Sequence, residues 1–158
     1  MKRFLFFVSL VLLTLPAVAS AQRIDLEVKG IDVGASYQTV LRQLGKPLSR
    51  KNGGIVPCSD GSILLTLRYQ GLKIELYSDD EGKSFYVFTM EVTSPKWSLS
   101  GLNIGATLKD VQAKFVQTRK PTKESGLENL SYFITDGYAN FWFRNNKLVK
   151  VDWELNLC

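Results

Sequence analysis

The sequence predicts an α+β fold of two tandem units, each a helix followed by a three-stranded antiparallel meander, which together form one curved sheet with the helices on one face. Two observations lead to this prediction. The stretch "GIDVGASYQTV" from Gly30 recurs as "GLNIGATLKDV" from Gly101, 71 residues later, which indicates an internal duplication. After each copy come three runs of β-branched and aromatic residues, joined by short polar or glycine-bearing connections that are typical of hairpins.

The N-terminal residues have the composition of a secretory signal peptide. Lys2 and Arg3 precede the apolar block "FLFFVSLVLLTL", and "AVASA" ends at Ala21 with small residues at the cleavage positions. An apolar block of about twelve residues is shorter than the roughly 20 that a membrane-spanning helix needs. We therefore expect residues 1–21 to be removed as a signal peptide and residues 22–158 to form a single domain of two repeats, about 30–100 and 101–158. The predicted location is periplasmic or secreted, without stable membrane insertion after cleavage.

The net charge gives little support for a nucleic-acid partner. The formal charge of the full chain is +5, and it falls to +3 when the leader with Lys2 and Arg3 is removed. A small surplus that is spread along the chain differs from the concentrated basic stripe of nucleic-acid-binding proteins. We therefore expect no nucleic-acid partner.

Each copy of the duplicated stretch is suited to begin a helix. The hydroxyls of Ser36 and Thr107 can cap the free amides of the first turn, and Asp110 lies three residues after Thr107, as in a capping box. The first helix is expected to stop at Gly45, because Pro47 follows it. The apolar residues after each cap recur at helical spacing, and they predict two short amphipathic helices: Tyr37, Val40, Leu41 and Leu44, then Leu108, Val111 and Phe115.

The expected strands are the runs that alternate or are rich in β-branched and aromatic residues. Two long segments, "GKPLSRKNGGIVPCSDG" from Gly45 and "QTRKPTKESGLEN" from Gln117, carry three of the five prolines together with several glycines and lysines, and are interpreted as exposed loops where function could lie. The expected strands are 62–69, 72–78, 84–92, 130–135, 138–144 and 147–155, with a further short edge strand at 24–28.

Alternation along these strands gives the sheet one apolar face, which would receive the helices, and one polar and aromatic face open to solvent. We predict that this open face binds a partner, because aromatic and cationic side chains gather on it. Tyr77 and Trp142 could instead pack only with their cross-strand neighbours on a solvated sheet. The predicted partner-binding residues are Arg68, Lys73, Tyr77, Phe133, Trp142, Arg144 and Lys150.

Cys58 and Cys158 are the only cysteines, and an even count in an exported chain favours a disulfide. We predict that they pair within the chain, closing a loop of about 100 residues, which contributes roughly 4 to 5 kcal/mol in the chain-entropy model. Two free thiols, or a bond between chains, are the alternatives.

The sequence lacks the usual means of catalysis. It contains no histidine, the commonest general base and metal ligand. Asp79, Asp80 and Glu81 are adjacent and precede Gly82, which favours a solvated turn over the spaced ligands of a calcium loop. Ser125 lies between Glu124 and Glu128 with no base in a defined geometry, so a hydrolase remains only a test case. We expect no enzymatic activity, no metal and no cofactor.

The stretches Val33–Pro47 and Ile104–Phe115 share a pattern of two hydrophobic residues, Gly-Ala-Ser/Thr and a following valine. With the meander that follows, this pattern resembles the tandem units of β-lactamase-inhibitor-protein-like folds, and a single copy is similar to the small outer-membrane assembly lipoproteins. In the inhibitors the concave aromatic face grips a loop of an enzyme. The inhibitors also hold each repeat with its own disulfide and the lipoproteins carry a lipid anchor, whereas this sequence has neither feature.

The expected function is therefore that of an exported, non-enzymatic protein-binding module, either an inhibitor of a secreted or periplasmic enzyme or an envelope partner. The alternative is an assembly or scaffold accessory of the cell envelope without inhibitory activity. In both cases the expected partner is another protein.

Overall fold

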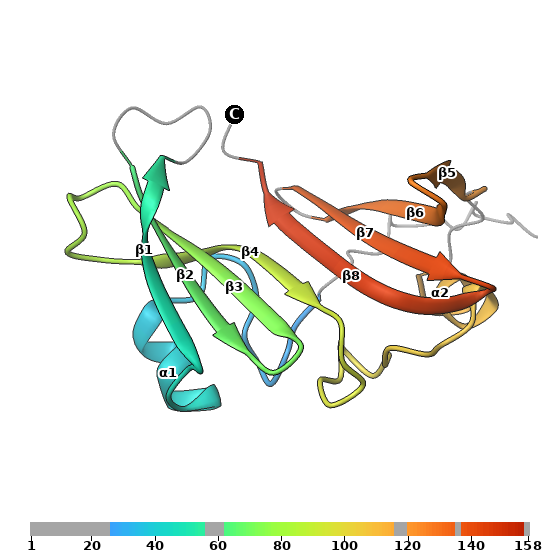
Figure 1. The fold of residues 1–158 in the computed structure, drawn as a ribbon, viewed down its shortest axis with the longest axis horizontal. Coiled ribbons are helices and arrows are strands. Elements are labelled where there is room, and N and C mark those ends of the chain that lie inside the picture. Colours follow the sequence, from blue (N-terminus) through green and yellow to red (C-terminus); the bar gives the residue numbers. More distant parts are fainter. Residues whose placement is uncertain (1–25, 56–61, 116–119, 135–136, 157–158) are drawn as a thin grey trace, which may run out of the picture.

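The computed structural model describes residues 26–55, 62–115, 120–134 and 137–156. These residues form an eight-stranded antiparallel sheet in the order β1-β2-β3-β4-β8-β7-β6-β5, with two short helices (Figure 1). Two meanders, β1 to β4 and β5 to β8, meet where β4 pairs with β8. The elements are α1 (Tyr37–Leu44), β1 (Ser49–Ile55), β2 (Ile63–Tyr69), β3 (Leu72–Ser78), β4 (Tyr86–Val92), α2 (Leu108–Phe115), β5 (Thr122–Glu124), β6 (Leu127–Ile134), β7 (Gly137–Arg144) and β8 (Lys147–Leu155).

The predicted α+β architecture of two helix plus three-strand units is wrong, because the described chain is mostly one large sheet. Strands β1 and β5 lie in the two segments interpreted as loops. Neither carries an apolar alternation, because each is at an edge of the sheet and the side chains of residues 49–54 and 122–124 are exposed. Their strand conformation comes from pairing with β2 and β6, as at Lys51 opposite Thr66 and Lys123 opposite Glu128.

The expected short edge strand at 24–28 is also wrong in the described part of that segment. Val28 forms only isolated bridges, with Ile31 and with Leu99. Residues 24 and 25 lie outside the described ranges.

Both helices begin as predicted. The Ser36 hydroxyl accepts a hydrogen bond from the Thr39 amide at 3.2 Å, and Thr107 Oγ1 accepts one from the Asp110 amide at 3.2 Å. The Asp110 carboxylate accepts in return from the Thr107 amide at 2.8 Å, which completes a capping box. The first helix ends at Gly45, whose φ of 75° allows its amide to donate to Leu41 O.

The two matching stretches make equivalent contacts with the two strands at the centre of the sheet. Gly34 N donates to Val87 O and Val87 N donates to Ala35 O, at 2.7 and 2.8 Å, on β4. The same two bonds recur on β8, where Gly105 N donates to Leu148 O and Leu148 N donates to Ala106 O, each at 2.8 Å. Positive φ values at both glycines, 82° and 98°, turn the chain from its contact with β4 or β8 toward the helix that follows. The shared sequence therefore has a local structural purpose.

The core lies between the helices and one face of the sheet. Val40 of α1 and Val111 and Phe115 of α2 are buried in the same hydrophobic cluster as alternate residues of the central strands. The Phe115 ring lies 5.3 Å from the ring of Tyr132 and 5.2 Å from that of Phe141, between centroids. This packing fixes which sheet face is covered and which is open.

Two expectations fall on parts of the chain that the structure does not describe. Residues 1–21, the predicted signal peptide, lie outside the described ranges, and so do Cys58 and Cys158 of the predicted disulfide. Across the described helices, none combines the length and apolar character required to cross a bilayer.

Candidate partner-binding face

The open face is formed by the strand side chains that alternate with the buried ones. Cross-strand pairing aligns one polar row over this face from β2 to β6. Such a continuous polar row is compatible with solvent on one side of an antiparallel sheet. The row consists of Arg68, Lys73, Glu91, Asp152, Asn140 and Ser131.

Trp142 and Lys150, two of the predicted binding residues, are directly paired on this face. The Trp142 indole donates to Asp152 Oδ1 at 2.5 Å, and Asn140 Nδ2 donates to Asp152 Oδ2 at 3.0 Å. Lys150 Nζ lies 2.9 Å from Asp152 Oδ1 and 4.6 Å from the centroid of the Trp142 ring. The indole is therefore held by a carboxylate on one strand and a cation above its face.

Two aromatic clusters lie on the same face, one in each meander. Tyr77 contacts Tyr86 and Phe88, with ring centroids 6.3 and 6.4 Å apart. The rings of Phe133 and Tyr138 are 4.9 Å apart. Phe133 is 57% exposed, Tyr138 42% and Tyr86 39%.

Sequence reasoning did not assign Tyr86, Phe88 or Tyr138 to this face. Tyr138 has the same strand parity as Trp142 and could have been found by extending the alternation one step, two residues, beyond Asn140. Phe88 could not, because a β-bulge opposite the Glu75–Leu76 step changes the parity of β4 and turns Phe88 outward.

The remaining predicted residues do not gather into one cluster. Lys73 forms an ion pair with Glu75 at 3.4 Å, and Arg68 lies opposite Lys73 on β2. Arg144 is exposed at the far end of β7, next to the hairpin that leads to β8. Arg68 and Arg144 are thus separated by β3, β4 and β8, and the predicted residues are distributed over the whole face.

Asp80, one of the acidic residues considered for chemistry, has a structural role. Asp80 Oδ1 accepts from the Ser78 hydroxyl at 2.7 Å and from the Ser84 amide at 2.8 Å. The Ser84 amide and then the Ser78 hydroxyl lower the pKa of Asp80 from 3.8 to about 2, so its charged form stabilises the turn before β4. Ser125 occupies the tight turn between β5 and β6 with a φ of 49°. The described residues contain no group of three or more His, Cys, Asp or Glu side chains placed to hold a metal.

Neither a family model nor a curated protein matches the chain. Solved structures of other proteins do match it. An extracellular protein containing an SCP domain from Bacillus anthracis str. Ames matches with a TM-score of 0.52 and 14% identity, over 88% of this chain and 50% of that one. A cysteine-rich secretory protein from Staphylococcus aureus subsp. aureus Mu50 matches with a TM-score of 0.50 and 15% identity, over 78% of this chain and 44% of that one.

The chain therefore spans about half the length of these structures, and the likeness concerns the fold alone. The resemblance to β-lactamase-inhibitor-protein-like folds and to the assembly lipoproteins is wrong, since the structural neighbours are SCP-type extracellular proteins. The pattern behind that resemblance belongs to the helix starts at Gly34 and Gly105, whose caps and turns many unrelated folds use.

Proposed function

We propose that the protein is an exported, non-enzymatic protein-binding module whose open sheet face carries the partner site. The observation that supports this most is the exposure of Phe133, Tyr138 and Tyr86 on the face that also carries the fixed Trp142. Exposed aromatic side chains on a face rimmed by charges are typical of interfaces.

These rings would lose little side-chain conformational entropy when a partner binds. Trp142 is already oriented by Asp152 and Lys150, and Phe133 and Tyr138 already pack on each other, so a partner would immobilise few side-chain rotamers. Aromatic anchors that become fully buried are often worth roughly 2 kcal/mol or more each.

Two observations support export. Residues 1–21 have the composition of a secretory leader. The two solved structures with a similar fold are described as an extracellular and a secretory protein. Periplasmic and fully secreted destinations are both compatible with these observations.

The test is affinity capture with matched variants. We expect the immobilised protein to retain a partner from an extract of the cell envelope and culture medium of its own organism. The double variant Phe133→Ser/Tyr138→Ser should lose that partner, because the apolar anchor of the open face is removed. Leu48→Ser, which changes an exposed apolar side chain on the helix side of the sheet, should keep it. Equal capture by both variants at unchanged thermal stability would contradict the proposal.

The identity of the captured protein separates the two functions expected from the sequence. A hydrolase whose activity falls on addition of the protein would make it an inhibitor. An outer-membrane or cell-wall assembly protein, with no loss of activity, would make it an accessory factor. Turnover of a peptide or wall substrate that Ser125→Ala abolishes would overturn the non-enzymatic assignment.

A further inference from the structure

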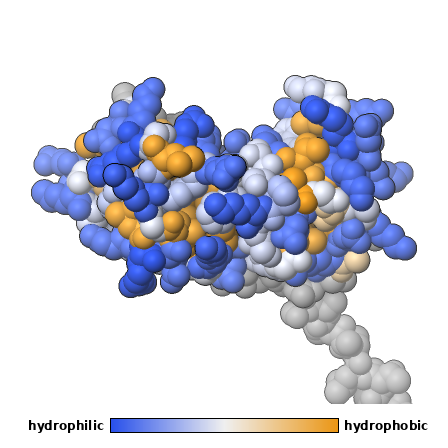
Figure 2. All heavy atoms as spheres, turned by 60° about the horizontal axis from the view of Figure 1, so that its bottom comes forward, coloured by the Kyte–Doolittle hydropathy of each residue, from blue (hydrophilic) through white to orange (hydrophobic). Residues whose placement is uncertain are grey.

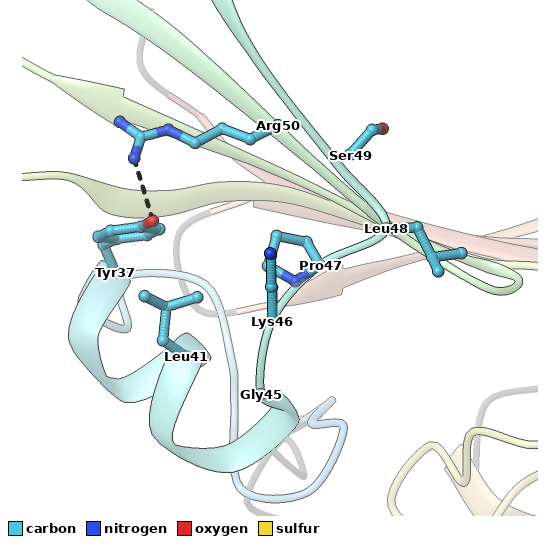
Figure 3. A pocket seen from close by; sticks show the side chains of 8 residues that line it. All are labelled: Tyr37, Leu41, Gly45, Lys46, Pro47, Leu48, Ser49 and Arg50. Carbon is cyan, nitrogen blue, oxygen red and sulfur yellow. Dashed lines mark hydrogen bonds between the residues drawn. The ribbon is translucent and has the colours of Figure 1, made fainter.

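A hollow of about 430 Å³ lies between α1 and β1, on the helix side of the sheet and away from the open face (Figure 3). Its side chains come from three consecutive pieces of chain: the helix, the connection after it and the start of the strand. Figure 2 turns the lower side of Figure 1 forward and shows apolar surface on this half of the molecule among hydrophilic residues. The hollow has an apolar lining of Tyr37, Leu41, Pro47 and Leu48 and a cationic rim of Lys46 and Arg50.

Hydrogen bonds fix the walls of this hollow. Arg50 Nη1 donates to Tyr37 Oη at 3.2 Å, and the guanidinium carbon lies 5.3 Å from the centroid of the tyrosine ring. Tyr69 Oη donates to Gly45 O at 3.0 Å and so ties the end of α1 to β2. Leu48 is 77% exposed at the mouth of the hollow, so an apolar ligand group could bury it.

The charged side chains of the segment that lines the hollow are all positive. Residues 35–55 include Arg42, Lys46, Arg50 and Lys51 and no carboxylate. Arg50 pairs with the buried Leu67 and therefore lies on the helix side, whereas Lys51 pairs with Thr66 and lies on the open side. Ser49, also on the open side, is paired with Arg68. Both faces of β1 thus present cations to whatever approaches its edge.

The edge of β1 offers the backbone groups that a further strand would need. In the order of the described strands β1 is outermost, so one of its two edges pairs with no described strand. Edge strands of this kind bind extended peptides by strand addition, with main-chain hydrogen bonds for affinity and alternate side chains for specificity.

We propose that the edge of β1 binds an extended segment of another protein in which apolar and acidic residues alternate. When such a segment pairs with β1, its apolar side chains enter the hollow beside Leu41 and Leu48. Its carboxylates, on the other face, lie near Lys51 and Arg68. A second copy of this chain fits poorly, because two neighbouring β1 strands would bring Arg50 and Lys51 against their own like charges. This site is separate from the aromatic clusters of the open face.

The probe is a short fluorescein-labelled peptide of alternating leucine and glutamate, and its binding is followed by fluorescence anisotropy. We expect saturable binding that weakens as salt is added. Leu48→Ser should weaken it about tenfold, since burial of a leucine side chain contributes that much. Lys51→Glu should weaken it severalfold, whereas Lys109→Glu on α2, with the same change in net charge, should have no effect.

Two further peptides test strand addition itself. A version that is N-methylated at alternate residues along one edge keeps every side chain but cannot donate to β1, and it should not bind. A version with lysine in place of glutamate should not bind either. Equal binding of the N-methylated peptide, or equal effects of Lys51→Glu and Lys109→Glu, would overturn the proposal.

The remaining outcomes also decide between occupants. A concentration-dependent dimer that Leu48→Ser disrupts, together with no peptide binding, would assign the edge to a second copy and overturn the proposal. The open-face variant Phe133→Ser/Tyr138→Ser should bind the peptide as tightly as the unmodified protein. Failure at β1 would therefore leave the open-face function standing, and the reverse also holds.

Discussion

The Trp142 indole donates its hydrogen bond to Asp152 Oδ1 on the neighbouring strand, and this bond connects β7 to β8 on the open face of the sheet. The same carboxylate receives Asn140 Nδ2 and the Lys150 ammonium. Asp152 therefore holds three side chains of the face in fixed positions. Its contribution to binding would be to orient Trp142.

Replacing Asp152 by alanine should lower the free energy of unfolding by about 1 to 2 kcal/mol, because the half-buried indole N–H and amide lose their acceptor. Urea unfolding measures this loss, and a change in tryptophan fluorescence should accompany it. Asp152→Asn keeps an acceptor oxygen and should lose less. If the alanine variant is as stable as the unmodified protein, the network is only a surface arrangement.

Replacing either helix cap by alanine should cost about 1 kcal/mol of stability, since each hydroxyl accepts from a first-turn amide. The variants are Ser36→Ala and Thr107→Ala, measured by urea unfolding. Thr107→Ser retains the hydroxyl and is the control. Both caps lie at helix starts on the covered side of the sheet, so capture of an open-face partner should be unchanged. Lost capture at unchanged stability would place these residues in a binding site.

Local patterns predicted the parts of the fold that local chemistry decides. The helix starts at Ser36 and Thr107 follow from hydroxyls and apolar spacing that are present in the sequence. Strand β3 and strand β8 were predicted with the observed bounds, because their alternation is regular and glycine or asparagine turns limit them. Strand β1 was missed, because "SRKNGGI" has no apolar alternation and becomes a strand only by pairing with β2.

The candidate site was predicted in outline, because the face on which a strand residue lies follows from local alternation. Strand parity alone placed Trp142 and Lys150 on one face, and cross-strand register then pairs them. The bulge that turns Phe88 toward the open face and the hydrogen bond of Trp142 to Asp152 depend on register between strands, which periodicity does not reveal. The hollow beside β1 depends on a strand that the sequence did not indicate.

Gly137 should be the least replaceable glycine in the second meander. A Cβ at this position would lie 1.7 Å from Glu154 O and 2.8 Å from the carbonyl carbon, both backbone atoms that cannot move aside cheaply. Gly137→Ala should therefore cost about 3 kcal/mol or more and separate the paired ends of β7 and β8. Chemical denaturation and amide exchange at Leu155 measure the two effects.

Gly126 is the matched control for that prediction. Its φ of 78° makes alanine strained, but a Cβ there would meet nothing within 4 Å. Gly126→Ala should cost only about 1 kcal/mol, from backbone strain alone. Similar losses at both positions would show that the contact with Glu154 is relieved by a small shift of β8.

The turn before β4 should make the protein sensitive to acid. Hydrogen bonds from the Ser84 amide and the Ser78 hydroxyl hold the pKa of Asp80 at about 2, below the usual 3.8 of the unfolded chain. A carboxyl whose pKa is lower in the folded state stabilises the fold above the unfolded pKa, and that contribution disappears as the pH falls from about 4 through 2. Asp80→Asn should therefore lose less stability over this interval than the unmodified protein, measured as the shift of the urea midpoint. Some acid sensitivity should remain in that variant, because the Thr107 hydroxyl and amide also lower the pKa of Asp110.

Asp79→Asn is the control, because it makes the same change in net charge one residue away. This variant should keep the full acid sensitivity. A parallel response of the two variants would show that net charge rather than the turn is responsible.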